Sequence, residues 1–317
     1  MTVHYPADNL AAPQYSNWDS VWTFSKISNQ DFGFKDFQLQ EEFPSLQSLN
    51  TDFEMNWDDG GVWTRATRVY WWAPLLGSLV YLTLVFVGPR YMRDRKPMDS
   101  KGLLATWNLF LALFSIVGTL RLIPHLGYGL AINHHTYFFC RNAYVAYGGF
   151  GPAGLWTNLF VFSKWPELID TVFLVARKKP VSFLHWFHHA TVLMYCWHAS
   201  EYQMPTGIFF ASMNYVVHSI MYFYYFLAAV IRPPRWGKLV TVLQIAQMFA
   251  GMFVTAYHYY LLKNVQNCDG SYNNLTAAFF MYTAYMVLFV QFFLSKYAKA
   301  KSSTAGGPNR STRSKKE

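Results

Sequence analysis

The chain has 317 residues, of which 53% are hydrophobic and 20% aromatic, and only 14% are charged, roughly half the charged fraction of a typical soluble domain. Its formal net charge is +9, but the basic residues stand in short runs between long apolar stretches and do not form one face. This distribution excludes a soluble globular protein and a nucleic-acid-binding protein, and it is typical of a protein embedded in a membrane.

The leading segment, residues 1–67, is polar, acidic and aromatic, and ten of the seventeen acidic residues of the chain precede Trp63. It lacks the basic start and apolar core of a cleavable signal peptide, so we expect the first membrane span to direct insertion. The segment shows no helical or strand period, and no secondary structure is predicted for it.

Seven windows of about 20 predominantly apolar residues follow, and each is long enough to cross the hydrocarbon core of a bilayer. We place them at residues 70–87, 103–123, 153–175, 181–197, 208–231, 239–261 and 275–294. The sequence therefore predicts an all-α integral membrane protein with seven transmembrane helices, which form one membrane domain over residues 68–301. Residues 302–317 are predicted to be a disordered basic tail because they are rich in Ser, Gly, Lys and Arg.

The loops between these windows alternate in charge. Basic runs follow the first, third, fifth and seventh windows, whereas the other three loops carry few basic residues. The positive-inside rule therefore places residues 1–67 in the lumen and the carboxyl-terminal tail in the cytosol. The runs are Arg90, Arg93, Arg95, Lys96 and Lys101; Arg177, Lys178 and Lys179; Arg232, Arg235 and Lys238; and Lys296, Lys299 and Lys301.

Two of the three cysteines, Cys140 and Cys268, fall in loops assigned to the lumen. A disulfide persists in an oxidising compartment, so we predict that these two pair, and the alternative is two unrelated free thiols. The third, Cys196, lies toward the lumenal end of its span. Three cysteines are too few for a disulfide framework or a zinc cage.

Ionisable side chains gather inside the third span, where each costs a few kcal/mol unless it faces a cavity or a partner. Lys164, Glu167, Asp170 and Thr171 recur three or four residues apart and therefore line one helical face. Pro166 is expected to bend the helix beside them. These residues form either a functional path or a structural ion network in which the two carboxylates neutralise Lys164.

The fourth span carries the sharpest signal in the chain. His185, His188 and His189 stand at i, i+3 and i+4, so three imidazoles share one face about one turn inside the cytosolic end. A single membrane histidine is usually a hydrogen-bonded core residue, whereas three on one stripe indicate a functional site.

The fifth and sixth spans carry further polar stripes at helical spacing, a pattern that hydrogen bonds between helices also produce. On the predicted topology most of these groups lie in the cytosolic half, with His218 nearer the middle. A polar pocket open to the cytosol in an apolar bundle suits a substrate with a polar handle and an apolar tail, such as acyl-CoA. The stripes are Asn214, His218, Tyr222 and Tyr225 in the fifth span, and Thr241, Gln244 and Gln247 in the sixth.

Four motifs at these positions resemble the hallmark patterns of the fatty acid elongase family, K-x-x-E-x-x-D-T, H-x-x-H-H, N-x-x-x-H-x-x-M-Y-x-Y-Y and T-x-x-Q-x-x-Q, and they occur in that order. One such box is weak evidence, but four linked motifs at matching depths are specific. The resemblance spans the chain from the first window to the last. It implies a fold in which the later six helices enclose an acyl tunnel.

The resemblance also implies an acyltransferase, a 3-ketoacyl-CoA synthase, that condenses acyl-CoA with malonyl-CoA and uses no metal and no tightly bound cofactor. It implies residence in the endoplasmic reticulum membrane, where a ketoacyl reductase, a dehydratase and an enoyl reductase complete the two-carbon cycle. Trp186, directly after the first box histidine, resembles the branch that acts on saturated and monounsaturated chains, and polyunsaturated substrates are the alternative. The long leading segment and the R-S-K-K-E end depart from the usual pattern of the family. Whether the protein forms homo-oligomers stays open.

Decarboxylative condensation needs an activated acyl group, donors for an enolate oxygen and a cavity poor in water. No cysteine is well placed as nucleophile, so histidine is the natural candidate, and we expect His188 to carry the acyl group. His185 and His189 would orient or polarise the reacting groups. His218 with Asn214 would stabilise the malonyl enolate. The carboxylates of the third span would fix imidazole tautomers. The alternative is direct attack in a ternary complex, with histidines acting only as acid, base or donor.

Basic residues at the cytosolic mouth are candidates for binding the phosphates of CoA. The same residues are also topology signals, so either CoA binding or membrane orientation explains their presence. They are Arg177, Lys178, Lys179, Arg232, Arg235 and Lys238.

Two other classes compete with this reading. A di-iron desaturase or hydroxylase also carries H-x-x-H-H boxes, but it needs about eight histidines around two metals, and four in the cytosolic pocket are too few. A seven-span receptor or transporter fits the span count and orientation, which are weak evidence for function. Ionisable groups packed into the cytosolic half suit the extracellular ligand of a receptor poorly.

Overall fold

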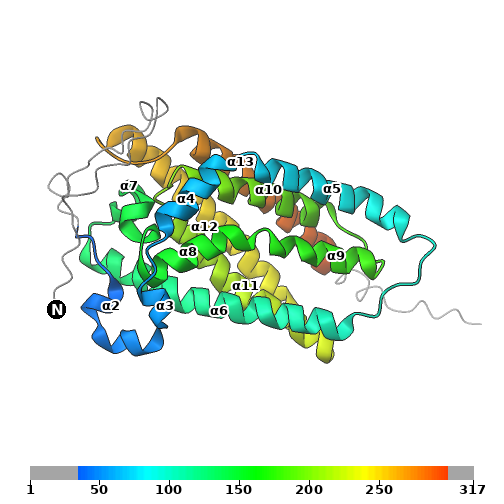
Figure 1. The fold of residues 1–317 in the computed structure, drawn as a ribbon. Coiled ribbons are helices and arrows are strands. Elements are labelled where there is room, and N and C mark those ends of the chain that lie inside the picture. The colour runs from blue at the N-terminus through cyan, green and yellow to red at the C-terminus, as the bar shows by residue number, and fades with distance from the viewer. Residues whose placement is uncertain (1–34, 299–317) are drawn as a thin grey trace, which may run out of the picture. The chain divides into compact units, whose positions relative to one another are not determined.

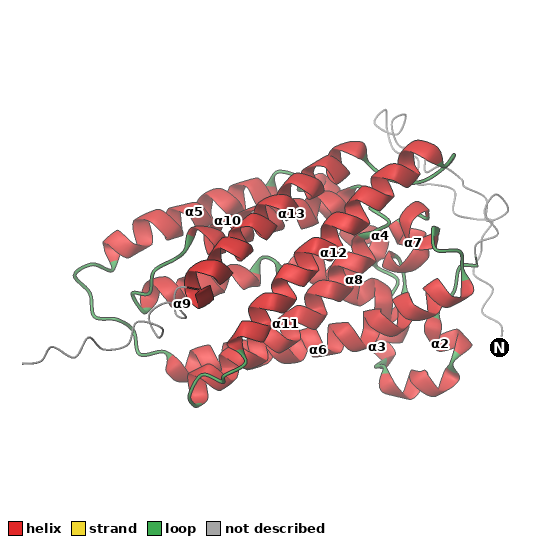
Figure 2. Cartoon of the chain, turned by 180° about the vertical axis from the view of Figure 1, so that it is seen from behind, coloured by secondary structure: helices red, strands yellow, loops and turns green. Residues whose placement is uncertain are grey.

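The computed structural model describes residues 35–298, and every regular element among them is a helix (Figures 1 and 2). The predicted basic tail, with Lys299 and Lys301, and most of the leading acidic segment lie outside the described residues.

Four short helices occupy the described part of the leading segment, for which the sequence predicted no secondary structure. They are α2 (Leu39–Glu42), η2 (Pro44–Leu49), α3 (Asp52–Met55) and α4 (Gly60–Val69). A capping box begins α3, because the Thr51 side chain accepts a hydrogen bond from the Glu54 amide while the Glu54 carboxylate accepts one from the Thr51 amide. Helices this short need tertiary contacts to persist.

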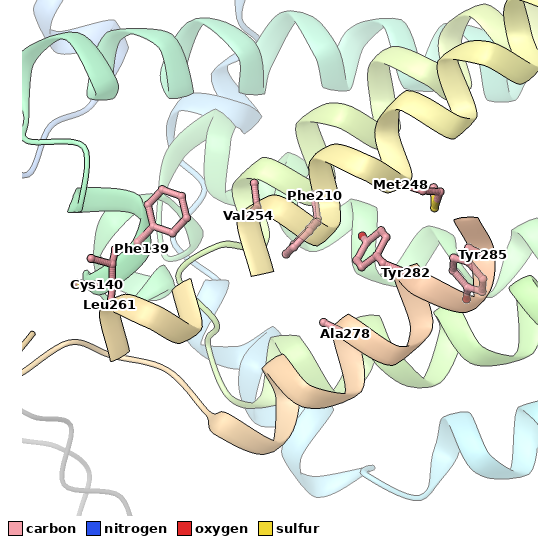
Figure 3. Close-up of a cluster of buried hydrophobic side chains, with 9 residues drawn as sticks. All are labelled: Phe139, Cys140, Phe210, Met248, Val254, Leu261, Ala278, Tyr282 and Tyr285. Atoms are coloured by element: carbon pink, nitrogen blue, oxygen red, sulfur yellow. The ribbon is translucent and has the colours of Figure 1, made fainter. Parts of the chain in front are cut away.

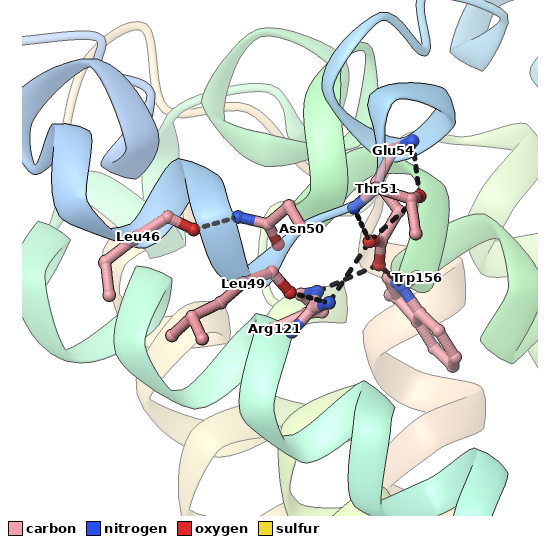
Figure 4. Close-up of polar contacts among 7 residues, drawn as sticks. All are labelled: Leu46, Leu49, Asn50, Thr51, Glu54, Arg121 and Trp156. Atoms are coloured by element: carbon pink, nitrogen blue, oxygen red, sulfur yellow. Dashed lines mark hydrogen bonds and ion pairs between the residues drawn. The ribbon is translucent and has the colours of Figure 1, made fainter.

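Glu54 supplies such a contact by joining this segment to the long helices (Figure 4). Its carboxylate accepts hydrogen bonds from Arg121 Nε at 2.8 Å and from Trp156 Nε1 at 2.7 Å. Arg121 Nη2 also donates to Leu49 O at 2.7 Å. Burial raises the pKa of Glu54, but the hydrogen bonds from Arg121, the Thr51 amide and Trp156 outweigh it and lower that pKa to about 2.

The long helices follow in the order that the hydropathy predicted, with shifted ends. They are α5 (Ala73–Tyr91), α6 (Lys101–Ile132), α8 (Gly151–Ser163), α9 (Ile169–Ala176), α10 (Phe183–Glu201), α11 (Gly207–Val230), α12 (Gly237–Asn264) and α13 (Tyr272–Phe293), which continues into η5 (Leu294–Ala298). The short α7 (Tyr137–Cys140) and η3 (Tyr144–Gly148) lie between α6 and α8. The third predicted span is not one helix, because the 3₁₀ turn η4 (Pro166–Leu168) separates α8 from α9.

Among the described residues, four helices are long and apolar enough to cross a membrane, namely α5, α6, α12 and α13 with η5. α10 and α11, which carry the histidine and asparagine stripes, are 19 and 24 residues long but are not among these four. Large apolar side chains such as Val80, Phe249 and Phe280 are 65%, 68% and 70% exposed. An apolar surface of this extent is stable against lipid and not against water, so the chain is an all-α multi-pass membrane protein. The count of seven spans remains a prediction.

Contacts between helices give the order of neighbours in the bundle. α6 packs against α11, α11 against α12, α12 against α13, α13 against α10, and α10 and α6 both against α8. α5 packs outside this ring on α10 and α9. α6 and α11 approach closely at Gly118, where a Cβ atom would lie 2.6 Å from the Tyr215 ring.

The loops that the sequence assigned to the lumen all lie at one end of the bundle, and those assigned to the cytosol lie at the other (Figure 1). At the first end a disulfide joins Cys140 of α7 to Cys268 in the loop between α12 and α13, the pair predicted from the sequence. A cluster of buried apolar side chains runs from Cys140 along α12 and α13 to Tyr285 (Figure 3). This cluster connects the disulfide to the region of the histidines.

Candidate active site

The candidate site begins at the break between α8 and α9. Pro166 is the first residue of η4, where its missing amide hydrogen leaves no helical hydrogen bond unmade. The Lys164 and Glu167 residues on either side of it are 2% and 4% exposed, and Lys164 Nζ lies 2.7 Å from Glu167 Oε1. Ser163 Oγ donates to the same oxygen at 2.9 Å. A charge pair this buried is stable only with such added hydrogen bonds.

Lys164 also reaches the fifth predicted span, where Nζ donates to Asn214 Oδ1 on α11 at 3.2 Å. The amide nitrogen of Asn214 lies 3.1 Å from His218 Nε2, one turn further along the helix. Because an ammonium only donates, the oxygen of Asn214 must face Lys164 and its NH₂ must face His218. His218 Nε2 is therefore the acceptor, and a neutral His218 carries its proton on Nδ1.

Asp170 does not pair with Lys164, which corrects the predicted ion network of one lysine and two carboxylates. Trp107 Nε1 of α6 donates to Asp170 Oδ1 at 2.6 Å, and Tyr222 OH of α11 donates to Oδ2 at 2.9 Å. The 3₁₀ turn changes the angular spacing between positions 164 and 170, so the helical period no longer places them together. Asp170 thus holds α9 against α6 and α11, and it fixes Tyr222 with its ring edge-on to His218, 5.2 Å between centroids.

The three box histidines meet at the start of α10, as the spacing predicted. The helix begins after Ser182, whose side chain accepts a hydrogen bond from the His185 amide. The rings of His185 and His189 lie 4.5 Å apart between centroids, and those of His188 and His189 lie 5.3 Å apart. Thr171 Oγ1 of α9 lies 2.8 Å from His185 Nε2.

The expectation that Glu167 and Asp170 fix the tautomers needs correction. Among the described hydrogen bonds, the groups on the imidazoles are the Thr171 hydroxyl for His185 and the Asn214 amide for His218. Both oxygens of Asp170 are already bound, to an indole and a phenol, and Oε1 of Glu167 is bound to a lysine.

The two histidine-bearing helices share one electrostatic environment. His188 of α10 lies close enough to His218 of α11, to Glu167 and to Lys164 for their charges to act on it. Its ring also packs at 5.0 Å from that of Tyr285, whose hydroxyl donates to the His188 carbonyl at 3.2 Å. A direct meeting of the His188 and His218 imidazoles remains a prediction.

Two buried polar atoms of this site have no hydrogen-bond partner among the described residues. They are Glu167 Oε2 and His189 Nδ1. Leaving a buried polar atom unpaired costs about 1–3 kcal/mol, so native sites rarely retain one without a reason. Both atoms are places where a polar group of a bound substrate, or a water, would make a hydrogen bond.

The other predicted pocket residues lie at its edge. Gln244 Nε2 donates to Met221 Sδ at 3.3 Å, and Thr241 Oγ1 to Gly237 O at 3.5 Å, which are contacts that join or cap helices. Gln247 is buried on the same side of α12. Tyr225, by contrast, is 44% exposed, because it lies in the last two turns of α11, where Phe223 is exposed as well. The place of Tyr225 in the pocket therefore stays a prediction.

The basic candidates for CoA binding lie in two loops at the end of the bundle nearest the box histidines. The first loop is tied to the segment between α5 and α6, because Lys178 Nζ donates to Arg93 O at 2.7 Å and the Met98 amide donates to Ala176 O at 2.9 Å. Directly after the second loop, in the first turn of α12, Lys238 Nζ lies over the Phe293 ring at 5.5 Å. Arg177, Lys179, Arg232 and Arg235 belong to the same two loops.

A cavity lies deeper in the bundle, between α8, α10 and α11. Asn158, Phe160, Tyr195, Cys196 and Phe210 are among its lining residues, and its surface is almost entirely apolar. None of the box histidines lines it, so a continuous tunnel from the histidines remains a prediction.

Comparison with known proteins adds an independent finding. Residues 67–305 match the ELO model, the GNS1/SUR4 family. The chain is 40% identical over 250 residues to very long chain fatty acid elongase 4 of Trypanosoma cruzi, with 75% of this chain and 84% of the relative covered. It is 38% identical over 234 residues to putative fatty acid elongase 3 of Caenorhabditis elegans (73% and 72% covered), and 37% identical over 234 residues to very long chain fatty acid elongase 3 of Homo sapiens (73% and 85% covered).

Proposed function

The chain belongs to the ELO (GNS1/SUR4) family, and is thus an enzyme of fatty acid elongation; from that premise we propose that it condenses a long-chain acyl-CoA with malonyl-CoA to 3-ketoacyl-CoA, carbon dioxide and free CoA. The observation that carries this proposal is a set of buried polar contacts beside the box histidines: the Lys164–Glu167 pair is linked through Asn214 to His218, and the rings of His185, His188 and His189 cluster at the start of α10. This arrangement offers a nucleophile and preset donors in a setting sheltered from water.

The first half-reaction transfers the acyl group to His188. The neutral imidazole attacks the thioester carbonyl, the carbon–sulfur bond breaks, and the imidazole proton leaves with the thiolate as CoA-SH. A carboxylate near this imidazole stabilises the positive charge that develops on it during attack. Glu167 Oε2, which has no partner among the described residues, suits that task.

The second half-reaction joins the two carbons. Malonyl-CoA loses carbon dioxide, the enolate carbon attacks the acyl-imidazole carbonyl, and the released imidazole takes up one proton. His218 can stabilise the enolate oxygen through Nδ1–H, because Asn214 occupies its Nε2. His185 and His189 then orient the groups around His188.

An alternative route keeps the histidines non-covalent, with the enolate attacking the thioester directly in a ternary complex. Incubation of the enzyme with acyl-CoA alone separates the two. The covalent route releases one equivalent of CoA and leaves a hydroxylamine-sensitive acyl group on the peptide that contains His188. Absence of both products would leave only the direct route.

We propose saturated and monounsaturated chains as the substrates, with polyunsaturated chains as the second class. The support is Trp186, directly after the first box histidine, which resembles the branch of the family that acts on those chains. The apolar cavity that Phe160 and Phe210 help to line suits the far end of an acyl chain of either class. The basic loops at the other end suit the phosphates of CoA.

We further propose that the protein resides in the endoplasmic reticulum with its amino terminus in the lumen. The alternation of basic runs supports this orientation, and so does the disulfide at the opposite end. The 3-ketoacyl product then needs a reductase, a dehydratase and a second reductase as partners on the cytosolic side.

The direct test uses purified protein, a panel of acyl-CoAs and malonyl-CoA labelled at its free carboxyl. We expect labelled carbon dioxide and a 3-ketoacyl-CoA two carbons longer than the acyl donor. Carbon dioxide release that does not depend on acyl-CoA, or the absence of any elongated product across the panel, would overturn the proposal.

A further inference from the structure

Tyr81 of α5 lies against the histidine box from a helix that the proposed mechanism does not use. It is only 3% exposed and packs with Val85 and Ala190 in a buried cluster. Its ring lies 6.3 Å from that of His189, and Ser78, one turn earlier, donates to the Ala190 carbonyl at 3.4 Å. α5 runs alongside α10 over this stretch (Figure 1).

Two hydroxyl groups connect Tyr81 to the box. Tyr81 OH lies 2.9 Å from Thr171 Oγ1, and Thr171 Oγ1 lies 2.8 Å from His185 Nε2. The line therefore crosses three elements, from α5 through α9 to α10. All three residues are at least partly buried, and Thr171 is fully buried.

The burial of Tyr81 determines which group donates and which accepts in each of these two hydrogen bonds. Thr171 is the partner of the Tyr81 hydroxyl among the described residues, and a buried phenol that only accepted would leave its hydrogen unpaired. Tyr81 therefore donates to Thr171. The single hydrogen of the Thr171 hydroxyl is then directed to His185 Nε2, which must be an unprotonated acceptor.

We propose that Tyr81 and Thr171 are positioning residues that hold His185 as the neutral tautomer protonated on Nδ1. The inference rests on the proposed condensation for its catalytic meaning. It assigns His185 one chemical role, since an imidazole whose Nε2 is occupied can offer only its Nδ1–H as a donor. The acyl group then goes to another imidazole of the box, in agreement with His188 as the nucleophile.

The proposal also gives α5 a part in the site. The resemblance to the elongase family implied that the later six helices enclose the substrate, which leaves the first span without a role. Tyr81 instead supplies the hydrogen bond on which the orientation of Thr171 depends.

The decisive experiment is nitrogen NMR of the resting protein in nanodiscs, with ¹⁵N-labelled histidine. A His185→Gln variant assigns the signals of His185. We expect an unprotonated Nε2 and a protonated Nδ1 in the wild type, and a mixture of the two tautomers in Tyr81→Phe. A wild-type His185 that is protonated on Nε2 overturns the proposal.

Kinetics then test the consequence. Tyr81→Phe keeps the ring and removes the hydroxyl, and we expect kcat to fall about tenfold while the KM values for both substrates change less than about twofold. Thr171→Val should lose at least as much, and Thr171→Ser, which restores the hydroxyl, should recover most of it. Unchanged kcat in Tyr81→Phe, or a Thr171→Ser variant as poor as Thr171→Val, contradicts a positioning role.

Tyr137→Phe is the matched control, because it also removes one buried phenol hydroxyl with a side-chain partner, Asp36, at the other end of the bundle. We expect its kcat and its His185 signals to match the wild type. The NMR measurement needs no substrate, so its outcome is independent of the proposed function. A wild-type protein without malonyl-CoA-dependent activity would reject the proposed condensation and would leave the tautomer proposal standing.

Discussion

Two buried glutamates at opposite ends of the bundle show how similar side chains serve different purposes. Glu54, at the end with the disulfide, uses both carboxylate oxygens, which accept from Arg121, Trp156 and Thr51 (Figure 4). Glu167 accepts from Lys164 and Ser163 on one oxygen only, and its other oxygen is unpaired among the described residues. A carboxylate whose two oxygens both accept hydrogen bonds stabilises the fold, whereas one with a free oxygen retains a position for a substrate.

The largest expected effect is at His188, the proposed nucleophile. His188→Ala should lower malonyl-CoA-dependent condensation about 1000-fold or more, because it removes the proposed nucleophile. The fold should persist, since Tyr285 bonds the backbone carbonyl at this position. His198→Ala, ten residues later in α10, is the control and should stay near wild-type activity. Retention of a tenth of the activity by His188→Ala would remove this residue from the mechanism.

The second prediction concerns Glu54, whose two oxygens both accept hydrogen bonds. Glu54→Gln should destabilise the protein by about 3 kcal/mol, because it leaves the mostly buried Arg121 guanidinium without its counter-charge. The kcat of the folded fraction should stay within about twofold of wild type. Urea unfolding in micelles, with activity per folded molecule, measures both quantities. Glu42→Gln, an exposed neighbour, should cost less than about 0.5 kcal/mol.

Glu167→Gln should differ from Glu54→Gln in its effect on kcat, although it too leaves a buried cation, Lys164, without its counter-charge and should cost stability as well. We expect kcat to fall about 100-fold, because the amide cannot stabilise positive charge on His188, while the amide oxygen still accepts from Lys164. Steady-state kinetics with both substrates check this outcome. A variant with normal kcat and a large loss of stability would make the two glutamates equivalent and defeat the comparison.

Acid should destabilise the protein at Glu54. The pKa of Glu54 lies at about 2 in the folded state against 4.5 for an ordinary glutamate, so its contribution to stability is complete above about pH 4.5 and is lost as the pH falls toward 2. The loss should be smaller than that caused by Glu54→Gln at neutral pH, since a protonated carboxyl still accepts hydrogen bonds. Thermal unfolding between pH 6 and pH 3 tests this, and a Glu54→Gln protein should show a flatter profile over the same range.

The smallest effects should come from the basic loops. Lys179→Gln and Arg177→Gln should each raise the KM for acyl-CoA about threefold and leave kcat unchanged, and added salt should reduce the difference. Lys263→Gln, a basic residue near the opposite end of α12, is the matched control. Equal KM values for all three variants would assign these loops to topology alone.

Much of the site follows from helical spacing. His185, His188 and His189 share a face because their spacing is i, i+3 and i+4, and Asn214 bonds His218 because it stands one turn away. These contacts lie within single helices, so the sequence contains the information they need.

Contacts between helices could not be predicted in the same way. Trp107 and Tyr81 resemble ordinary aromatic core residues in sequence, and only the packing of α6 and α5 shows that they donate to Asp170 and Thr171. The 3₁₀ turn at Pro166 likewise redirects Asp170, which a continuous helix would have placed beside Lys164. The short helices α2 and α3 have no periodic signal, and contacts with the long helices stabilise them, from Tyr128 to Glu42 and from Arg121 and Trp156 to Glu54.

The bond between Cys140 and Cys268 closes a covalent ring of chain that contains α8 to α12, and hence both histidine-bearing helices. A protease that cuts the exposed loop at Lys178 and Lys179 would therefore produce two pieces that stay joined. The nicked molecule should migrate as one band on a denaturing gel until a reductant is added, and as two bands afterwards. A cut between α9 and α10 would therefore leave the helices that carry the site joined through the disulfide.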